Sequence, residues 1–325
     1  MSEISKQGRT VADVLRNTDD YVSGEKLAAS LGVSRTAVWK VIKELRENGF
    51  VIDASTRLGY KLLSEKYLDA DAIKKYLKHS YIDPQVYRSV SSTNTLAKAA
   101  AENGAAEGTL LLADSQSAGR GRVGKSFYSP GGSGLYMSMI LRPQMSASDA
   151  LRITACAAVS TAEAIEEVTG ISTGIKWVND LFVGNKKVCG ILTEASFNME
   201  SGGLDYAVLG IGINVFEPER GFGELSNIAG SLFQSTVCSS DIKCRIAAAV
   251  MDRFFERYES LSDDLLLREY RERLFILGKK IYVLRHGISL EAVVLDIDSA
   301  FRLLVQYANG EREYLSSGEI SIIPM

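Results

Sequence analysis

Apolar residues near the start of the chain recur at the three- and four-residue spacing of helices with one buried face. The positions that carry this pattern are Leu27, Ala28, Leu31, Val33, Val38, Val41, Ile42 and Leu45. They predict two helices joined by a turn at Gly32, with Ser34 as the N-cap of the second helix and Gly49 closing it. We therefore expect a helix, a turn and a second helix between residues 24 and 49.

The second predicted helix carries basic and hydrogen-bonding side chains, several of them near its start. Segments 50–53 and 59–63 then predict a hairpin. Two helices followed by such a hairpin resemble a winged helix-turn-helix, which we expect to fill residues 1–65 and to bind DNA. The predicted DNA-binding residues are Ser34, Arg35, Thr36, Trp39, Lys40 and Lys43. A helical hairpin that makes only protein contacts is the alternative.

Helical and strand patterns are mixed between residues 66 and 272. Helices are predicted over 93–103 and 148–169. The predicted strands cover 110–112, 135–141, 175–183, 186–193 and 207–215. The third and fourth of these strands form a hairpin turned at Gly184 and Asn185. This region is therefore expected to be an α+β domain.

The last segment, residues 273–325, reads as short alternating strands. They cover 280–284, 290–296, 302–307 and 311–315. Asn309 and Gly310 predict a hairpin turn between the last two strands. We expect a small antiparallel β-barrel, either as a packing cap or as a docking surface for a protein substrate.

Charge and hydropathy limit the classes of partner that the protein can bind. The chain has 325 residues, of which 46% are hydrophobic and 24% charged, and its formal net charge is −3. No overall positive field would draw it to nucleic acid, so DNA binding must rest on a local basic surface. The start lacks the apolar core of a signal peptide, and no apolar run is long enough to span a bilayer. We expect a cytoplasmic protein without membrane contact.

Cysteine and histidine positions predict neither a metal centre nor a nucleophile. The cysteines are Cys156, Cys189, Cys238 and Cys244, and none forms a C-x-x-C pair. His79, in a helical linker, and His286, in a C-terminal hairpin, are the two histidines of the chain. We expect both to be surface histidines, and we expect no Ser–His triad and no protein metal site.

A glycine-rich segment, Gly-Arg-Gly-Arg-Val-Gly-Lys at 119–125, matches the G-x-G-x-x-G pattern. A turn and another strand follow it instead of a helix, which argues against a dinucleotide-binding site. Arg120, Arg122 and Lys125 can still surround an anion while the glycines let backbone N–H groups approach it. On this pattern alone, a phosphate-binding loop and a solvated basic turn are equally supported.

Polar residues interrupt the apolar elements of the central region. They are Ser92–Asn94, Lys176 with Asn179 and Asp180, Lys187, and Asn214. A pocket with apolar walls and a few converging polar groups suits a small ligand. Each group also has a plain structural explanation, as a helix cap, a turn residue or a solvated strand residue.

Taken together and in order, these segments resemble those of biotin protein ligases. The matching segments are Ser92-Thr93-Asn94, Gln116 with Gly119-Arg120-Gly121-Arg122, Lys176-Trp177-Val178-Asn179-Asp180, Lys187-Val188-Cys189-Gly190-Ile191-Leu192 and Gly210-Ile211-Gly212-Ile213-Asn214. With the N-terminal module, the resemblance is to bifunctional ligases that also repress biotin genes. It spans essentially the whole chain.

The resemblance implies a reaction in two steps. The biotin carboxylate attacks the α-phosphate of ATP, supplied with Mg²⁺, to form biotinyl-5′-AMP and pyrophosphate. A lysine of a biotin carboxyl carrier protein then attacks the mixed anhydride. Neither step needs a protein nucleophile, and positioning alone can supply roughly 7–11 kcal/mol. The adenylate would also act as corepressor, promoting a homodimer that binds operator DNA.

The resemblance also implies a role for each matching residue. Biotin would contact Ser92, Thr93, Asn94, Gln116, Arg120, Gly121, Arg122 and Lys187, with Arg120 and Lys187 as the catalytic residues. ATP would contact Arg122, Lys125, Phe127, Lys176, Asn179 and Asn214. The chain departs from the family's pattern at Val123 and Lys125, where arginines are common, at Phe127, where tryptophan is common, and at Val178, where proline is usual. Phe127 can still stack, and Lys125 keeps its charge without a bidentate fork.

Two other functions stay open at this point. A ligand-sensing repressor would bind a small acid without chemistry, although the cationic loop and Lys187 favour an enzyme. A lipoate-type ligase would share the adenylation step but would not ordinarily carry the winged domain. We also expect residues 117–126 to be mobile without ligand and ordered by the adenylate, because fixing a residue costs about 1–2 kcal/mol.

Overall fold

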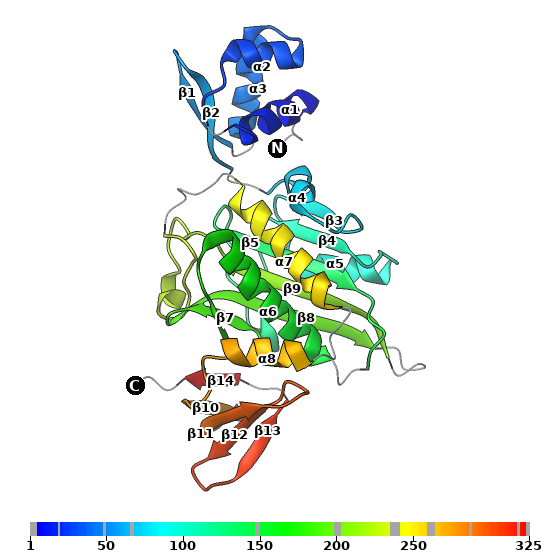
Figure 1. Cartoon of the computed structure of the whole chain (residues 1–325), viewed down its shortest axis with the longest axis vertical. Helices are drawn as coiled ribbons and strands as arrows, with labels where there is room; N and C mark the ends of the chain where they lie inside the picture. The colour runs from blue at the N-terminus through cyan, green and yellow to red at the C-terminus, as the bar shows by residue number, and fades with distance from the viewer. Residues whose placement is uncertain are drawn as a thin grey trace.

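The fold consists of three units that follow one another along the chain and along the long axis of the molecule (Figure 1). The structure is a computed structural model that describes residues 5–18, 20–47, 50–65, 68–146, 150–197, 203–234, 241–258, 264–285, 288–316 and 319–322. The expected α+β class is confirmed, with an N-terminal helix-turn-helix, a central mixed domain and a C-terminal sheet. Across the described residues, no helix is both long and apolar enough to cross a membrane.

The N-terminal unit is a three-helix module with a two-stranded wing. Its elements are α1 (Lys6–Arg16), α2 (Gly24–Leu31), α3 (Arg35–Glu47), β1 (Phe50–Ser55) and β2 (Gly59–Glu65). Gly32 ends α2 with a left-handed φ of 64°, and the Ser34 hydroxyl accepts a hydrogen bond from the Ala37 N–H at 3.3 Å, so the predicted turn and cap are confirmed. The predicted end of α3 at Gly49 lies outside the described residues.

The apolar residues that predicted these helices form a core of their own. Leu27, Val38 and Leu45 are fully buried, and they pack with Val11 and Leu15 of α1 in a cluster separate from the central core. Helix α1 was not among the predicted elements. The wing pairs residue 50 with 65 and residue 55 with 59, which confirms the expected hairpin.

The central unit is built on a seven-stranded sheet with the order β3-β4-β5-β9-β8-β7-β6. Its strands are β3 (Asp83–Tyr87), β4 (Thr109–Ala113), β5 (Gly134–Leu141), β6 (Gly174–Lys176), β7 (Asp180–Val183), β8 (Lys186–Phe197) and β9 (Leu204–Asn214). Strands β3 and β4 run parallel and the other pairs are antiparallel. The helices are α4 (Ala70–Tyr76), α5 (Thr93–Glu102), α6 (Ala150–Thr169), α7 (Ile242–Tyr258) and α8 (Asp264–Arg273).

Alternating side chains bury both faces of this sheet. Leu110 and Leu112 belong to the main core with α6 and α7, whereas Leu111 lies between them in sequence and packs with Ala97 and Ala101 of α5. Helices α6 and α7 therefore cover one face (Figure 1), and the short helix α5 covers part of the other. The part that α5 leaves uncovered is where a cavity can form.

The single strand predicted over 175–183 is wrong, because a turn at residues 177–179 divides it into β6 and β7. The indole N–H of Trp177 donates to the Phe301 carbonyl at 2.8 Å, and the buried Tyr270 hydroxyl donates to the Val178 carbonyl at 3.1 Å. The peptide between Trp177 and Val178 is cis. Contacts from α8 and from the C-terminal unit thus fix a turn that the apolar run did not reveal.

The C-terminal unit is a five-stranded antiparallel sheet with the order β13-β12-β11-β10-β14. The strands are β10 (Lys280–Arg285), β11 (Ile288–Ile297), β12 (Leu303–Tyr307), β13 (Arg312–Leu315) and β14 (Glu319–Ile322). Within the described part of this unit the edge strands β13 and β14 do not pair, so the closed barrel stays a prediction. Phe301, fully buried against Tyr270 at 5.4 Å between ring centroids, joins this sheet to α8.

The histidine expectation needs a correction. His79 follows α4 instead of lying within a helix, and its Nδ1 lies 3.0 Å from Oδ1 of the buried Asp252. The His79 ring also contacts the rings of Tyr81 and Phe255, so it is a partly buried structural residue and not a surface histidine. His286 and Cys238 lie outside the described residues, and the other three cysteines are buried free thiols.

Candidate active site

A cavity of 430 Å³ lies on the face of the central sheet that α5 covers only in part. The cavity extends down to the sheet because glycines occupy positions where larger side chains would fill the space. Gly190 pairs across the strands with Gly212, and Gly210 lies opposite Ser138. A Cβ atom at Gly210 would come within 2.0 Å of Asn94 Oδ1, and one at Gly212 within 2.6 Å of the Phe127 ring. These glycines therefore admit the site's own side chains.

The structure brings all of the sequence-predicted biotin and ATP residues to this one cavity. They are Ser92, Thr93, Asn94, Gln116, Arg120, Gly121, Arg122, Lys125, Phe127, Lys176, Asn179, Lys187 and Asn214. They come from the start of α5, the segment after β4 that includes the glycine loop, the end of β6 and the β6–β7 turn, β8 and the end of β9. Segments more than a hundred residues apart in sequence thus form one site, as the resemblance implied.

At one end of the cavity, the first turn of α5 presents a network of neutral hydrogen-bonding groups. The Ser92 hydroxyl caps the helix by accepting from the Thr95 N–H, so the plain structural explanation holds for this residue as well. The Thr93 N–H donates to Gln116 Oε1 at 2.8 Å, and the Gln116 side-chain amide donates to the Ser129 hydroxyl at 2.9 Å. Thr93 and Asn94 are buried, which makes the network rigid.

Two residues that hydrogen-bond to this network were missed by the sequence analysis: Ser138, which is neutral, and Glu194, a carboxylate at its border. The Ser138 hydroxyl lies 2.7 Å from Thr93 Oγ1 and 2.6 Å from Asn94 Oδ1, and it is fully buried. Glu194 accepts a hydrogen bond from Asn94 Nδ2 at 3.0 Å. The available signal was a polar residue inside an apolar strand, at 134–141 for Ser138 and next to 186–193 for Glu194.

The glycine loop forms a compact turn with its own hydrogen bonds. Gly121 N–H donates to the Lys125 carbonyl at 2.7 Å, and Phe127 N–H donates to the Gly119 carbonyl at 2.9 Å. At the tip, the exposed Val123 has a left-handed φ of 53°. Such a conformation strains a β-branched residue.

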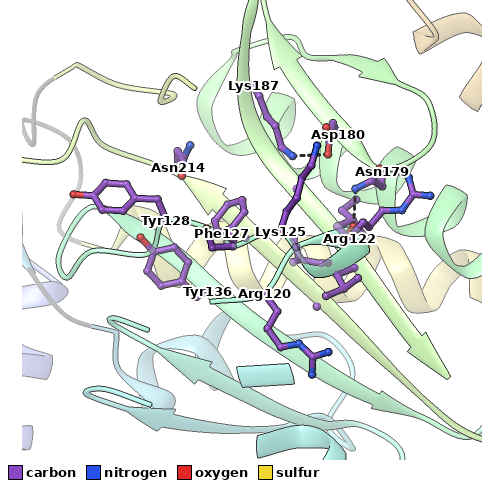
Figure 2. Close-up of a pocket in the computed structure, with 18 of the residues that line it drawn as sticks. Arg120, Arg122, Lys125, Phe127, Tyr128, Tyr136, Asn179, Asp180, Lys187 and Asn214 are labelled. Carbon is purple, nitrogen blue, oxygen red and sulfur yellow. Dashed lines mark hydrogen bonds and ion pairs between the residues drawn. The ribbon is translucent and has the colours of Figure 1, made fainter. Parts of the chain in front are cut away.

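The two arginines of the loop point to different partners. The Arg120 guanidinium lies 3.0 Å from Glu194 Oε1, while Arg122 donates to Asn179 Oδ1 at 3.0 Å. Figure 2 shows Arg120 extending away from the end of the cavity that holds Lys187, and Lys125 directed toward that end. The structure therefore does not bring Arg120, Arg122 and Lys125 around a single point.

Lys187 occupies the opposite end of the cavity from Arg120 (Figure 2). Its Nζ lies 2.7 Å from Asp180 Oδ1, and only about a quarter of each side chain is exposed. The side-chain amide of Asn179, in the β6–β7 turn, donates to the Ile191 carbonyl at 2.9 Å. The Asn179 backbone carbonyl accepts from the Ile191 N–H at 2.9 Å, so both bonds hold the residue beside the loop. A cation held in a partly desolvated pocket can stabilise negative charge that develops on a ligand.

Aromatic side chains line the middle of the cavity. Phe127 lies over Gly190 and Gly212, with its ring centroid 6.3 Å from that of Tyr136 in an edge-to-face arrangement. Burial raises the pKa of Tyr136 well above its usual value, so its hydroxyl stays protonated and donates to the Pro130 carbonyl at 3.0 Å. The Phe127 ring is the flat apolar surface on which a purine could stack.

A second candidate surface lies on α3 of the N-terminal unit. All six predicted DNA-binding residues, Ser34, Arg35, Thr36, Trp39, Lys40 and Lys43, are exposed. Trp39 has 56% of its surface accessible, an unusual exposure for an indole. Among the residues that the structure describes, no group of three or more His, Cys, Asp or Glu side chains could hold a metal ion.

Comparisons with known proteins agree with this arrangement. A model of the biotin/lipoate A/B protein ligase family matches residues 86–214, a helix-turn-helix domain model matches 9–61, and a model of the biotin protein ligase C-terminal domain matches 276–322. The bifunctional ligase/repressor BirA of Bacillus subtilis is 42% identical over 221 residues, which are 67% of this chain and 67% of that protein. BirA of Escherichia coli is 28% identical over 291 residues, which are 85% of this chain and 88% of that protein.

A solved structure shows the same fold. The biotin protein ligase from Aquifex aeolicus, in complex with biotin and ATP, superimposes with a TM-score of 0.60 at 25% identity, covering 74% of this chain and 99% of that chain. Along this chain the three family models match in the order helix-turn-helix, ligase and C-terminal domain. The chain therefore belongs to the family of bifunctional biotin protein ligases and repressors.

Proposed function

We propose that this protein activates biotin with MgATP as biotinyl-5′-AMP and transfers the biotinyl group to one lysine of a biotin carboxyl carrier protein. The observation that carries the proposal is the single cavity that joins a neutral hydrogen-bonding end, an aromatic middle and a cationic end. The neutral end suits the bicyclic urea of biotin, the aromatic middle suits a purine, and the cationic end suits a phosphate. The family membership favours this reaction over a non-catalytic sensor or a lipoate ligase.

The neutral end of the cavity suits the ureido ring of biotin. That ring offers one carbonyl acceptor and two N–H donors, and it carries no charge. Thr93, Asn94 and Gln116 present hydroxyl and amide groups at this end. Thr93 and Gln116 hydrogen-bond to each other, and Asn94 accepts from Ser138, so these bonds fix their orientation before a ligand enters. Preorganised neutral partners bind such a ring without leaving a buried charge unpaired.

The cationic end suits the reacting groups. Lys187 would stabilise the negative charge shared between the biotin carboxylate and the α-phosphate, because a unit charge pair 4 Å apart contributes about 4 kcal/mol at an intermediate dielectric. Arg120 pairs with Glu194 at the other end of the cavity in this structure, so it would have to turn toward the phosphate to act as the second catalytic cation. Phe127 would stack on adenine, and Lys176, Asn179 and Asn214 would place the phosphates of MgATP. Carboxylate and phosphate react directly, so no protein nucleophile is required.

The N-terminal unit would act as a repressor of biotin genes. The exposed face of α3 offers Arg35, Lys40 and Lys43 to phosphates and base edges, while the whole chain is net negative. One small module of this kind binds DNA weakly at physiological salt. A homodimer that forms with bound biotinyl-5′-AMP would place two such helices on two half-sites of an operator.

Intact mass spectrometry of a carrier domain tests the ligase. Incubation with the protein, biotin and MgATP should add one biotinyl group, and Lys187→Ala or Arg120→Ala should abolish the addition. Lys186→Ala is the matched control, because Lys186 is the exposed neighbour on β8 and should leave the product unchanged. An unmodified carrier together with tight biotin binding would favour the sensor. Competition by lipoate would favour a lipoate-type ligase.

A further inference from the structure

Glu194, on β8, contacts two segments that line the ligand cavity. Its Oε1 lies 3.0 Å from the Arg120 guanidinium, and its Oε2 accepts from Asn94 Nδ2 at 3.0 Å. One carboxylate thus joins the glycine loop to the first turn of α5. About a quarter of the Glu194 side chain and about half of the Arg120 side chain are exposed. Solvent can therefore reach the pair, and Arg120 also lines the cavity.

The Asn94 contact is fixed in one orientation. Asn94 Oδ1 accepts from Ser138 at 2.6 Å and lies over Gly210, where a Cβ would approach to 2.0 Å. The amide nitrogen must therefore face Glu194 and the Leu192 carbonyl. A neutral side chain with a carbonyl oxygen at position 194 could accept the same hydrogen bond.

The Arg120 contact is a matter of charge. Figure 2 shows the Arg120 side chain directed away from Lys187. Its guanidinium pairs with Glu194. A phosphate bound between the loop and Lys187 would compete with the carboxylate for the same cation. The Glu194 carboxylate thus weakens the binding of a phosphate ligand to Arg120.

We propose that Glu194 is a positioning residue with two separable actions: it orients Asn94 toward biotin, and it holds Arg120 as a counter-ion that a phosphate group must displace. This inference rests on the proposed function, since it requires biotin at Asn94 and a phosphate at Arg120. Glu194 delays engagement of the loop until an anionic ligand arrives. The phosphate of the adenylate can therefore release Arg120 from Glu194, whereas the uncharged ureido ring of biotin cannot.

Two variants separate the actions. Glu194→Gln keeps an acceptor for Asn94 and removes the charge, whereas Glu194→Ala removes both. The neutral probe is biotin methyl ester, and the anionic probe is the stable phosphodiester formed from biotinol and AMP. Calorimetry with both probes on the full chain, in about 0.1 M salt where the Debye length is about 10 Å, gives their dissociation constants.

We expect Glu194→Gln to bind the phosphodiester about three- to fivefold more tightly than the wild type, the size that a partly exposed ion pair supports. Its affinity for the methyl ester should stay unchanged, while Glu194→Ala should bind the methyl ester more weakly. Combining Glu194→Gln with Arg120→Ala should remove the gain for the phosphodiester. A gain that persists without Arg120 would indicate a general field effect and would overturn the counter-ion action.

Unchanged or weaker phosphodiester binding by a folded Glu194→Gln protein would also overturn that action. Unchanged methyl ester binding by Glu194→Ala would overturn the orienting action. If the wild-type protein bound neither probe, the proposed function itself would fail, and this outcome is distinct from all the others. Thermal unfolding of each variant checks that the comparison is made between folded proteins.

Discussion

Replacing Gly210 with alanine should selectively damage the biotin end of the cavity. The added Cβ would lie 2.0 Å from Asn94 Oδ1 and 2.8 Å from its Cγ, whereas ordinary heavy-atom contacts begin near 3.5 Å. Asn94 must therefore retreat by roughly 1.5 Å. Its hydrogen bond from Ser138, 2.6 Å long in the structure, cannot survive that movement.

The magnitude follows from the groups left without partners. Biotin would lose the polar partner that Asn94 offers, and a polar group left without its hydrogen bond costs about 1–3 kcal/mol. The buried Ser138 keeps its contact with Thr93 Oγ1 at 2.7 Å. If the displaced Asn94 no longer meets biotin, the loss lowers biotin affinity by about 5- to 150-fold. Thermal stability should fall as well, because overpacking a core typically costs about 1–3 kcal/mol.

Isothermal titration with biotin alone, followed by titration with MgATP, measures the effect. Gly212→Ala is the paired variant: its Cβ would meet the Phe127 ring at 2.6 Å, so it should weaken MgATP more than biotin. Gly131→Ala is the control, because its Cβ would find its nearest neighbour at 3.8 Å, which is an ordinary contact. A folded Gly210→Ala protein that binds biotin like the wild type would refute the placement of biotin at Asn94.

Three further measurements test other parts of the structure. Burial raises the pKa of Cys156 to about 12 and the pKa of Cys189 further. At pH 8 both thiols should therefore resist iodoacetamide in the native protein and react fully in urea, which peptide mass spectrometry measures. Rapid labelling of the native protein would contradict their burial. Trp39→Ala should lower retention of operator DNA at least about tenfold in mobility-shift assays while carrier biotinylation and the melting temperature stay unchanged, and undiminished retention would remove α3 as the recognition helix. Amides of residues 117–126 should exchange more slowly once biotinyl-5′-AMP is bound, and identical exchange with and without it would exclude ordering of the loop.

The sequence by itself determined the local elements and the chemistry of the site. Helical spacing located α2 and α3, and Ser34 marked the start of the second because a hydroxyl there satisfies a free backbone N–H. The ordered motifs named the residues that line the cavity. Such features depend on residues within a few positions of one another, so they can be predicted from one amino-acid sequence.

Only the tertiary structure decided how these residues meet. Ser138 and Glu194 entered the site through strand pairing, which places Gly210 between Ser138 and Leu192 although the three are far apart in sequence. The turn that divides 175–183 depends on Tyr270 and Phe301, more than ninety residues away. Arg120 was expected to share one anion site with Arg122 and Lys125, but it pairs with Glu194 because that carboxylate lies nearby on β8. Register, distant packing and charge pairing are long-range properties, and local spacing carries no record of them.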